Sequence, residues 1–134
     1  MPASAKRPPR YLLDTSAILA YLLNEPAAGR VAALQTQAAL PFVSVAELYA
    51  ALWVRLGQAK ADEAVAAVRA WELPWLWPTE EVVLLAGRWR AVYRLGLADS
   101  FIAALAFLTH ATLVSKDPDF RPLQPDLRLL DLSA

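Results

Sequence analysis

The chain has 134 residues, 57% of them hydrophobic and 19% charged, so it is long enough for one domain and too apolar to stay disordered. Its 13 basic residues balance 13 acidic ones, which argues against nucleic-acid binding through bulk positive charge but leaves a local basic patch open. It contains no cysteine and one histidine, which excludes disulfides, zinc–thiolate sites, cysteine nucleophiles and multi-histidine metal sites.

Short apolar runs alternate with amphipathic stretches along the chain. In chain order, the pattern predicts a strand at 11–13, helices at 17–23 and 27–39, a strand at 40–43, helices at 44–56 and 60–71, a strand at 73–77, helices at 79–95 and 97–110, a strand at 112–115 and an edge strand at 127–130. Gly57 and Gly96 are the predicted helix stops. This order indicates an α/β fold with a central, mainly parallel sheet of about five short strands flanked by helices.

Residues 1–10 are predicted to be a disordered tail, and 11–134 a single domain. No uncharged stretch reaches the roughly 20 apolar residues of a membrane span, and no clear signal-peptide cleavage site follows the basic start of the chain. We therefore expect a cytoplasmic protein, an expectation with which the absence of cysteine is compatible. Most of the five tryptophans (Trp53, Trp71, Trp75, Trp77 and Trp89) are expected to be buried.

Four carboxylates stand out because apolar sequence surrounds them: Asp14, Glu47, Asp99 and Asp117. Asp14 and Asp117 follow predicted strands, whereas Glu47 and Asp99 lie in the first turns of predicted helices. The carboxyl ends of parallel strands meet at one edge of a sheet, which is where such folds bind ligands. All four side chains can therefore face the same rim.

Each of the four also fits a local structural role when taken alone. Asp14 and Asp99 can cap helices, and Asp117 precedes a proline and can initiate a turn. Ser44 and Glu47 match the S-x-x-E capping box, in which the glutamate returns to the backbone amide of the serine.

A cluster of all four carboxylates requires neutralisation. Two unit charges about 5 Å apart repel by roughly 3 kcal/mol at an effective dielectric constant of about 20. The cluster persists only if some groups take up protons or a cation binds. Ligands that are all oxygen favour a hard cation, Mg²⁺ or Mn²⁺, and such ions held by carboxylates are typical of phosphate-ester chemistry.

The segments around these carboxylates resemble the four acidic motifs of the PIN domain family. The matching stretches are LLDTSAIL at 12–19, VSVAEL at 43–48, GLADSFIAA at 96–104 and LVSKDPDF at 113–120. The likeness runs from about residue 11 to residue 132 and keeps the order and spacing of the motifs. Within the family, the chain looks most like the VapC toxins of bacterial and archaeal toxin–antitoxin pairs. The resemblance implies a Mg²⁺- or Mn²⁺-dependent endoribonuclease that acts on RNA, is restrained by a cognate antitoxin and is often a homodimer.

By motif position, the resemblance implies that Asp14, Glu47, Asp99 and Asp117 form the acidic quartet. Asp14 and Asp99 would be direct metal ligands, and Glu47 and Asp117 would bind directly or through water. The other candidates are three supporting polar residues (Thr15, Ser115 and Asp119) and four substrate contacts (Arg90, Arg94, Lys116 and Arg121). Ser115 stands where the family often has threonine, and it keeps the hydroxyl group. Asp119 is either a fifth carboxylate or a loop residue, and Thr15 either bonds within the cluster or caps the helix.

Three other functions stay open at this point. One is a PIN-like module that binds RNA or protein without catalysis, although all four carboxylates are present. Another is a PIN nuclease in RNA processing outside a toxin–antitoxin pair. A third is an α/β phosphatase or phospho-receiver domain with a nucleophilic aspartate. Ser16 argues against a phosphatase, which usually has a second carboxylate two residues after the first, and Asp14 lacks the paired acid of a receiver.

Overall fold

Five strands form one parallel sheet at the centre of the molecule. The structure, a computed structural model, describes residues 8–133. The strands are β1 (Tyr11–Leu13), β2 (Ala38–Pro41), β3 (Trp75–Leu76), β4 (Thr112–Ser115) and β5 (Leu129–Asp131), and their spatial order is β3-β2-β1-β4-β5. Every neighbouring pair is parallel. The predicted α/β fold with a parallel five-stranded sheet is confirmed.

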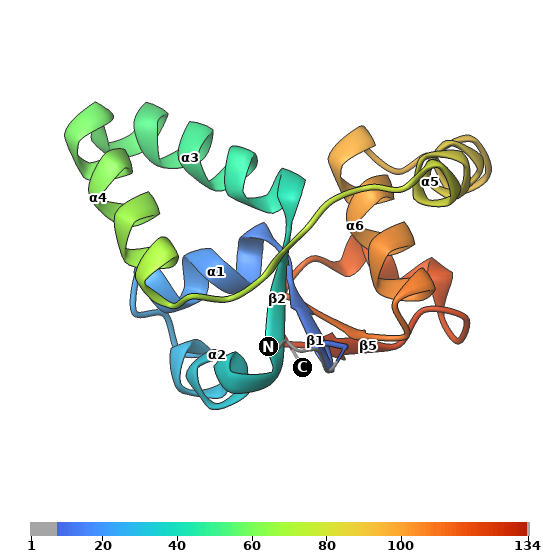
Figure 1. Cartoon of the computed structure of the whole chain (residues 1–134), viewed down its shortest axis with the longest axis horizontal. Coiled ribbons are helices and arrows are strands. Elements are labelled where there is room, and N and C mark those ends of the chain that lie inside the picture. The colour runs from blue at the N-terminus through green and yellow to red at the C-terminus, as the bar shows by residue number, and fades with distance from the viewer. Residues whose placement is uncertain (1–7, 134) are drawn as a thin grey trace, which may run out of the picture.

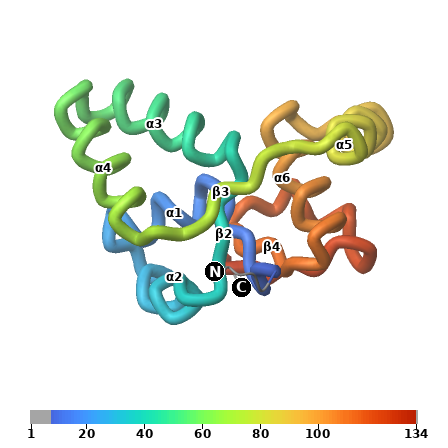
Figure 2. The backbone as a smooth tube through the Cα atoms, in the orientation of Figure 1, coloured from blue at the N-terminus to red at the C-terminus, as the bar shows by residue number. Residues whose placement is uncertain are grey.

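Helices cover both faces of this sheet. They are α1 (Thr15–Leu22), α2 (Ala28–Leu34), α3 (Phe42–Leu56), α4 (Gln58–Ala70), α5 (Glu80–Tyr93) and α6 (Leu97–Leu108), with short 3₁₀ turns at Gln35–Gln37 and Pro118–Leu123. Figures 1 and 2 show α1 to α4 on one side of the sheet and α5 and α6 on the other. Successive strand residues face opposite sides. Leu12 and Leu113 accordingly join the core under α5 and α6, whereas Leu13 and Val114 join the core under α1 to α4.

The region of 27–43 differs from the sequence prediction. The predicted helix at 27–39 ends at Leu34, and β2 begins at Ala38, earlier than the predicted strand at 40–43. Ala38 and Ala39 pair with β1 and are buried, so tertiary pairing overrides the helix preference of alanine.

The start of α3 also differs from the prediction. Pro41 is the N-cap, and the helix begins at Phe42 instead of Ser44. Pro41 is also the last residue of β2, and its φ of −59° and ψ of 138° are extended, a conformation that the fixed φ of proline allows. The capping-box interpretation is therefore wrong. Glu47 lies in the second turn, and the buried Ser44 hydroxyl has no hydrogen-bond partner within residues 8–133.

Smaller differences concern the ends of other elements. α5 ends at Tyr93, before the predicted stop at Gly96, and Arg94 takes the left-handed conformation (φ 57°) at its C-terminus. Arg90 stabilises this turn because its Nη1 donates to the Leu95 carbonyl at 2.9 Å. The edge strand β5 lies at Leu129–Asp131, slightly later than the predicted 127–130, and α4 begins two residues before the predicted 60.

The chain is tied to the sheet before residue 11. The backbone N–H of Arg10 donates to the Gln37 carbonyl at 2.9 Å, and its carbonyl accepts from the Thr112 N–H at 2.8 Å. Arg10 therefore belongs to the folded part, and residues 1–7 of the predicted tail lie outside the described residues. None of the helices described is long and apolar enough to cross a membrane.

Candidate functional site

Two aspartates lie at the carboxyl ends of neighbouring strands. Asp14 follows β1 directly, and Asp117 follows β4 after one intervening residue. The two strands are paired in register, with Leu13 opposite Val114, and the Asp14 N–H donates to the Val114 carbonyl at 3.2 Å. β1 separates β2 from β4 in the sheet, so this is the point at which the strand order changes direction. Parallel sheets commonly bind ligands in the crevice at such a point.

The Asp14 carboxylate is buried and held by three donors. Its Oδ1 accepts from Ser16 Oγ at 2.7 Å and from the Ala17 N–H at 2.9 Å, and its Oδ2 accepts from Ser115 Oγ at 2.5 Å. Only 4% of the residue is exposed. Burial raises the pKa of Asp14, because desolvation penalises the charged form more than the hydrogen bonds from Ser115 and Ser16 favour it.

The same two serines connect Asp14 to the turn after β4. Ser16 Oγ accepts from the Lys116 N–H at 2.9 Å, and Ser115 Oγ accepts from the Asp117 N–H at 2.9 Å. Each hydroxyl therefore donates to the carboxylate and accepts from the backbone of the turn. This pair of bridges fixes the position of Asp117 relative to Asp14.

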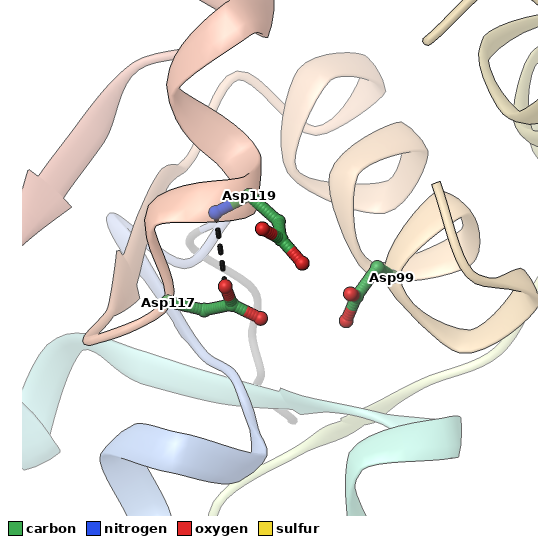
Figure 3. Close-up of side chains that lie close together, drawn as sticks. All are labelled: Asp99, Asp117 and Asp119. Carbon is green, nitrogen blue, oxygen red and sulfur yellow. Dashed lines mark hydrogen bonds between the residues drawn. The ribbon is translucent and has the colours of Figure 1, made fainter. Parts of the chain in front are cut away.

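Three carboxylates converge next to this turn. Asp99, Asp117 and Asp119 each offer an oxygen within 4.8 Å of those of the other two, and Figure 3 shows them facing one another. Asp99 comes from the first turn of α6, whose N-cap is Gly96. Asp117 Oδ1 accepts from the Asp119 N–H at 2.9 Å, which orients it at the start of the 3₁₀ turn. We call Asp99, Asp117 and Asp119 the carboxylate cluster.

Glu47 lies outside this group of three but acts on it electrostatically. Thr15 Oγ1 donates to Glu47 Oε1 at 2.8 Å, which fixes the side chain. Thr15 thus bonds within the site, in accordance with one of its two predicted roles. The charge of Glu47 contributes to the shift of the pKa of Asp99, as do those of Asp117, Asp14 and Asp119. The structure therefore brings all four sequence-predicted carboxylates into one site.

The neighbouring carboxylates and burial change the pKa of Asp99. Its pKa is raised to about 7, first by burial and then by the like charges of the neighbouring carboxylates. The carboxylate cluster is all oxygen and concentrates negative charge, which fits a hard divalent cation such as Mg²⁺ or Mn²⁺. Asp99, Asp117 and Asp119 are the residues that can hold such an ion, with Asp14 behind them.

The four predicted RNA-contacting cations are placed differently from one another. Lys116 forms an ion pair with Glu25, and Arg121 pairs with Asp131 at 2.8 Å. Arg90 and Arg94 line a shallow pocket of about 530 Å³ next to Gly96, just before α6. None of these four basic side chains forms a hydrogen bond or an ion pair with the carboxylate cluster in the part of the chain that the structure describes.

Sequence reasoning gave no role to Ser16 and only a supporting role to Asp119. The spacing of Asp119, two residues after Asp117, is the signal that points to a second carboxylate on the same turn. No comparable signal marks Ser16, because its backbone partner Lys116 lies 100 residues away.

Replacing Ser16 with alanine should destabilise the protein by about 1–3 kcal/mol. The change removes a donor from buried Asp14 and leaves the Lys116 N–H without its acceptor. Urea unfolding measures the effect, and Thr36→Ala, which removes the hydroxyl of an exposed residue, is the control with an expected change within about 0.5 kcal/mol. Equal effects of the two substitutions would contradict the role given to the Ser16 bridge.

Comparison with protein families matches the PIN domain model over residues 11–124. Comparison with curated proteins gives no match. Among solved structures, the chain is similar to VapBC-1 from nontypeable Haemophilus influenzae, with 25% identity and a TM-score of 0.73 over 92% of this chain and 98% of that chain.

Two further structures share the fold at lower identity. DNA-bound VapBC from Salmonella typhimurium has a TM-score of 0.77 and 19% identity, over 92% of this chain and 98% of that chain. VapBC-5 from Mycobacterium tuberculosis, a member of a family of toxin–antitoxin systems, has a TM-score of 0.68 and 19% identity, over 92% of this chain and 99% of that chain.

Proposed function

The chain belongs to the PIN domain family, and from this premise we propose that it is a Mg²⁺- or Mn²⁺-dependent endoribonuclease that hydrolyses phosphodiester bonds in RNA. The observation that carries the proposal is the carboxylate cluster at the carboxyl edge of the sheet, where three acidic oxygens lie within 4.8 Å of one another. Repulsion between these carboxylates lowers the stability of the protein, and a cation bound among them would remove that repulsion.

The proposed catalytic residues are Asp14, Glu47, Asp99 and Asp117, now joined by Asp119. Asp99, Asp117 and Asp119 would hold the ion. Asp14, which the family resemblance makes a direct ligand, lies outside this group of three and would act on the site through its charge and through Ser115. When bound, the ion would activate water and stabilise the negative charge that develops on the phosphate.

The remaining residues of the site have positioning roles in this proposal. Ser16 and Ser115 hold Asp14 and the turn that carries Asp117. Thr15 holds Glu47, which is exposed and therefore accessible to water. Glu47 is thus an ordered carboxylate available to accept a proton during hydrolysis.

We further propose that the protein is the toxin of a VapBC-type pair. The similarity to VapBC-1 of Haemophilus influenzae over nearly the full length of both chains supports this role. The proposal includes a cognate antitoxin as partner, a homodimeric assembly and a cytoplasmic location, where RNA is present.

Cleavage of a mixed pool of single-stranded RNA by the purified protein tests the proposed activity. We expect cutting with Mg²⁺ or Mn²⁺, none with chelator, and none by an Asp99→Asn variant, which controls for contaminating nuclease. Asp126→Asn, at an exposed aspartate away from the cluster, should cut normally. Absence of cutting by folded, antitoxin-free protein with either ion would favour a binding module without catalysis.

A further inference from the structure

A row of aromatic rings runs from the protein surface to the helices that carry Asp99 and Glu47. Trp77 is 65% exposed. It stacks on Phe42, with ring centroids 5.9 Å apart and an interplanar angle of 24°. Phe42, the first residue of α3, packs edge-to-face with Phe101, with ring centroids 5.4 Å apart and an interplanar angle of 79°. Phe101 lies on α6, the helix that also carries Asp99, although the two side chains, two residues apart, are on different faces of it. Two ring contacts therefore connect the exposed indole to this helix.

Trp77 also forms one wall of a groove. The groove has a volume of about 550 Å³ and is bordered by β3, α3 and α4. Trp75 lies next to Trp77 in it, with centroids 6.3 Å apart, and the guanidinium of Arg69 sits 5.7 Å from the Trp75 ring centroid. Asp62 also lines the groove, where it accepts a hydrogen bond from the Tyr49 hydroxyl, so Arg69 and Asp62 balance in charge and the aromatic surface is the main feature. Flat aromatic surface of this kind binds the bases of single-stranded nucleic acid by stacking.

Charge near the carboxylate cluster gives RNA little attraction. Lys116 and Arg121, the basic residues nearest in sequence to Asp117, already form ion pairs with Glu25 and Asp131. The carboxylates themselves repel phosphate, and the formal net charge of the chain is zero. Arg90 and Arg94 line the pocket next to Gly96, outside the groove of Trp77. An interaction that does not depend on net positive charge would therefore add to RNA binding at this site, and base stacking is such an interaction.

We propose that Trp77 is a stacking platform for an unpaired RNA base next to the cleavage site, with its indole supported from behind by Phe42. This inference rests on the proposed ribonuclease function and adds a residue, Trp77, that would hold the RNA strand by stacking on one of its bases. A base in a duplex is already paired and stacked, so it does not reach an exposed indole without being flipped out.

Fluorescence anisotropy with a labelled single-stranded RNA oligonucleotide tests the proposal. The full chain carries Asp99→Asn, so that RNA binds without being cut, and Mg²⁺ is present. Trp77→Ala should weaken binding by about 5- to 150-fold, the usual effect of removing one base–aromatic stack, and Trp77→Phe should restore much of it. Trp53→Ala is the matched control, because Trp53 is also exposed, at 44%, but lies near the far end of α3. A competing duplex of the same sequence should bind all variants equally.

The outcomes separate this inference from the proposed function. The stacking role alone would be overturned if Trp77→Ala leaves RNA affinity unchanged while the wild-type chain, with both Asp99 and Trp77 in place, cuts RNA. If Trp77→Ala weakens binding of the antitoxin but leaves RNA affinity unchanged, the stacking role is also overturned, and the groove is assigned to the antitoxin. If the otherwise wild-type chain neither binds nor cuts single-stranded RNA, the proposed function fails and the stacking role fails with it. Thermal melts establish that each variant is folded.

Discussion

Replacing Asp99 with asparagine should weaken Mn²⁺ binding by at least about a hundredfold and should stabilise the metal-free protein at pH 8. Asp99 supplies one of the three converging oxygens. Losing groups that merely orient metal ligands already costs about 10–100-fold in affinity, so losing a ligand should cost at least as much. The gain in stability follows because the neutral amide removes a half-buried charge from among its like-charged neighbours.

Electron paramagnetic resonance of free Mn²⁺ gives the affinity, and thermal melts in chelator give the stability. Asp126→Asn removes the same charge from an exposed position and should change neither quantity appreciably. A large loss of metal-free stability in Asp99→Asn would indicate a structural role for Asp99 and would count against the site as described.

The stability of the metal-free protein should fall as the pH rises from 5 to 8. The pKa of Asp99 is raised to about 7 in the folded protein, above the ordinary 3.8 of an aspartate, so the folded state binds more protons than the unfolded state throughout this window. Deprotonation then favours unfolding, and we expect Asp99 to lower the free energy of unfolding by about 2 kcal/mol between these pH values. Asp14, whose pKa is also raised, acts in the same direction.

Metal should reverse this trend. The ion binds deprotonated carboxylates, so with saturating Mg²⁺ the free energy of unfolding should rise between pH 5 and pH 8. Urea unfolding at four pH values, with chelator and with Mg²⁺, measures both curves. Asp131 does not interfere, because its pKa is lowered and its contribution is lost only in more acidic solution. Parallel curves with and without Mg²⁺ would show that no ion binds at Asp99.

The sequence predicts the location of the site because strand ends are easy to recognise. One apolar run stops at Asp14, and another stops at Ser115, two residues before Asp117. Both aspartates are therefore predicted at one edge of a parallel sheet, and the structure has the two strands paired next to each other. The positions of Glu47 and Asp99 near the same edge are predicted from the helices that begin shortly before them. The arrangement of α/β layers follows from the same alternation of apolar runs and helices.

Other features depend on contacts that a linear pattern does not contain. Ser16 meets the Lys116 N–H across 100 residues, and Lys116 is drawn to Glu25 across 91. The sequence shows neither partner, so Ser16 receives no role and Lys116 looks free to bind phosphate. The start of β2 at Ala38 is set by pairing with Tyr11, which local helix preference does not predict.

Burial of the tryptophans is the clearest case of this kind. Trp89 is buried, at 9% exposure, as expected, but Trp53 and Trp77 are 44% and 65% exposed. Trp77 follows directly after the two-residue strand β3. Its ring contacts the rings of Phe42 and Trp75, and most of the residue is exposed. Hydrophobicity alone predicts burial, and only the structure shows which rings face outward.

One set of carboxylates should both bind the metal and support RNA cleavage. The most direct test measures single-turnover RNA cleavage against Mn²⁺ concentration and Mn²⁺ affinity on the same samples, for the wild-type chain, Asp117→Asn and Asp126→Asn. The Mn²⁺ concentration at half-maximal cleavage should equal the Mn²⁺ dissociation constant, and both values should rise together in Asp117→Asn but not in Asp126→Asn. Cleavage that persists in Asp117→Asn with an unchanged midpoint would contradict this prediction.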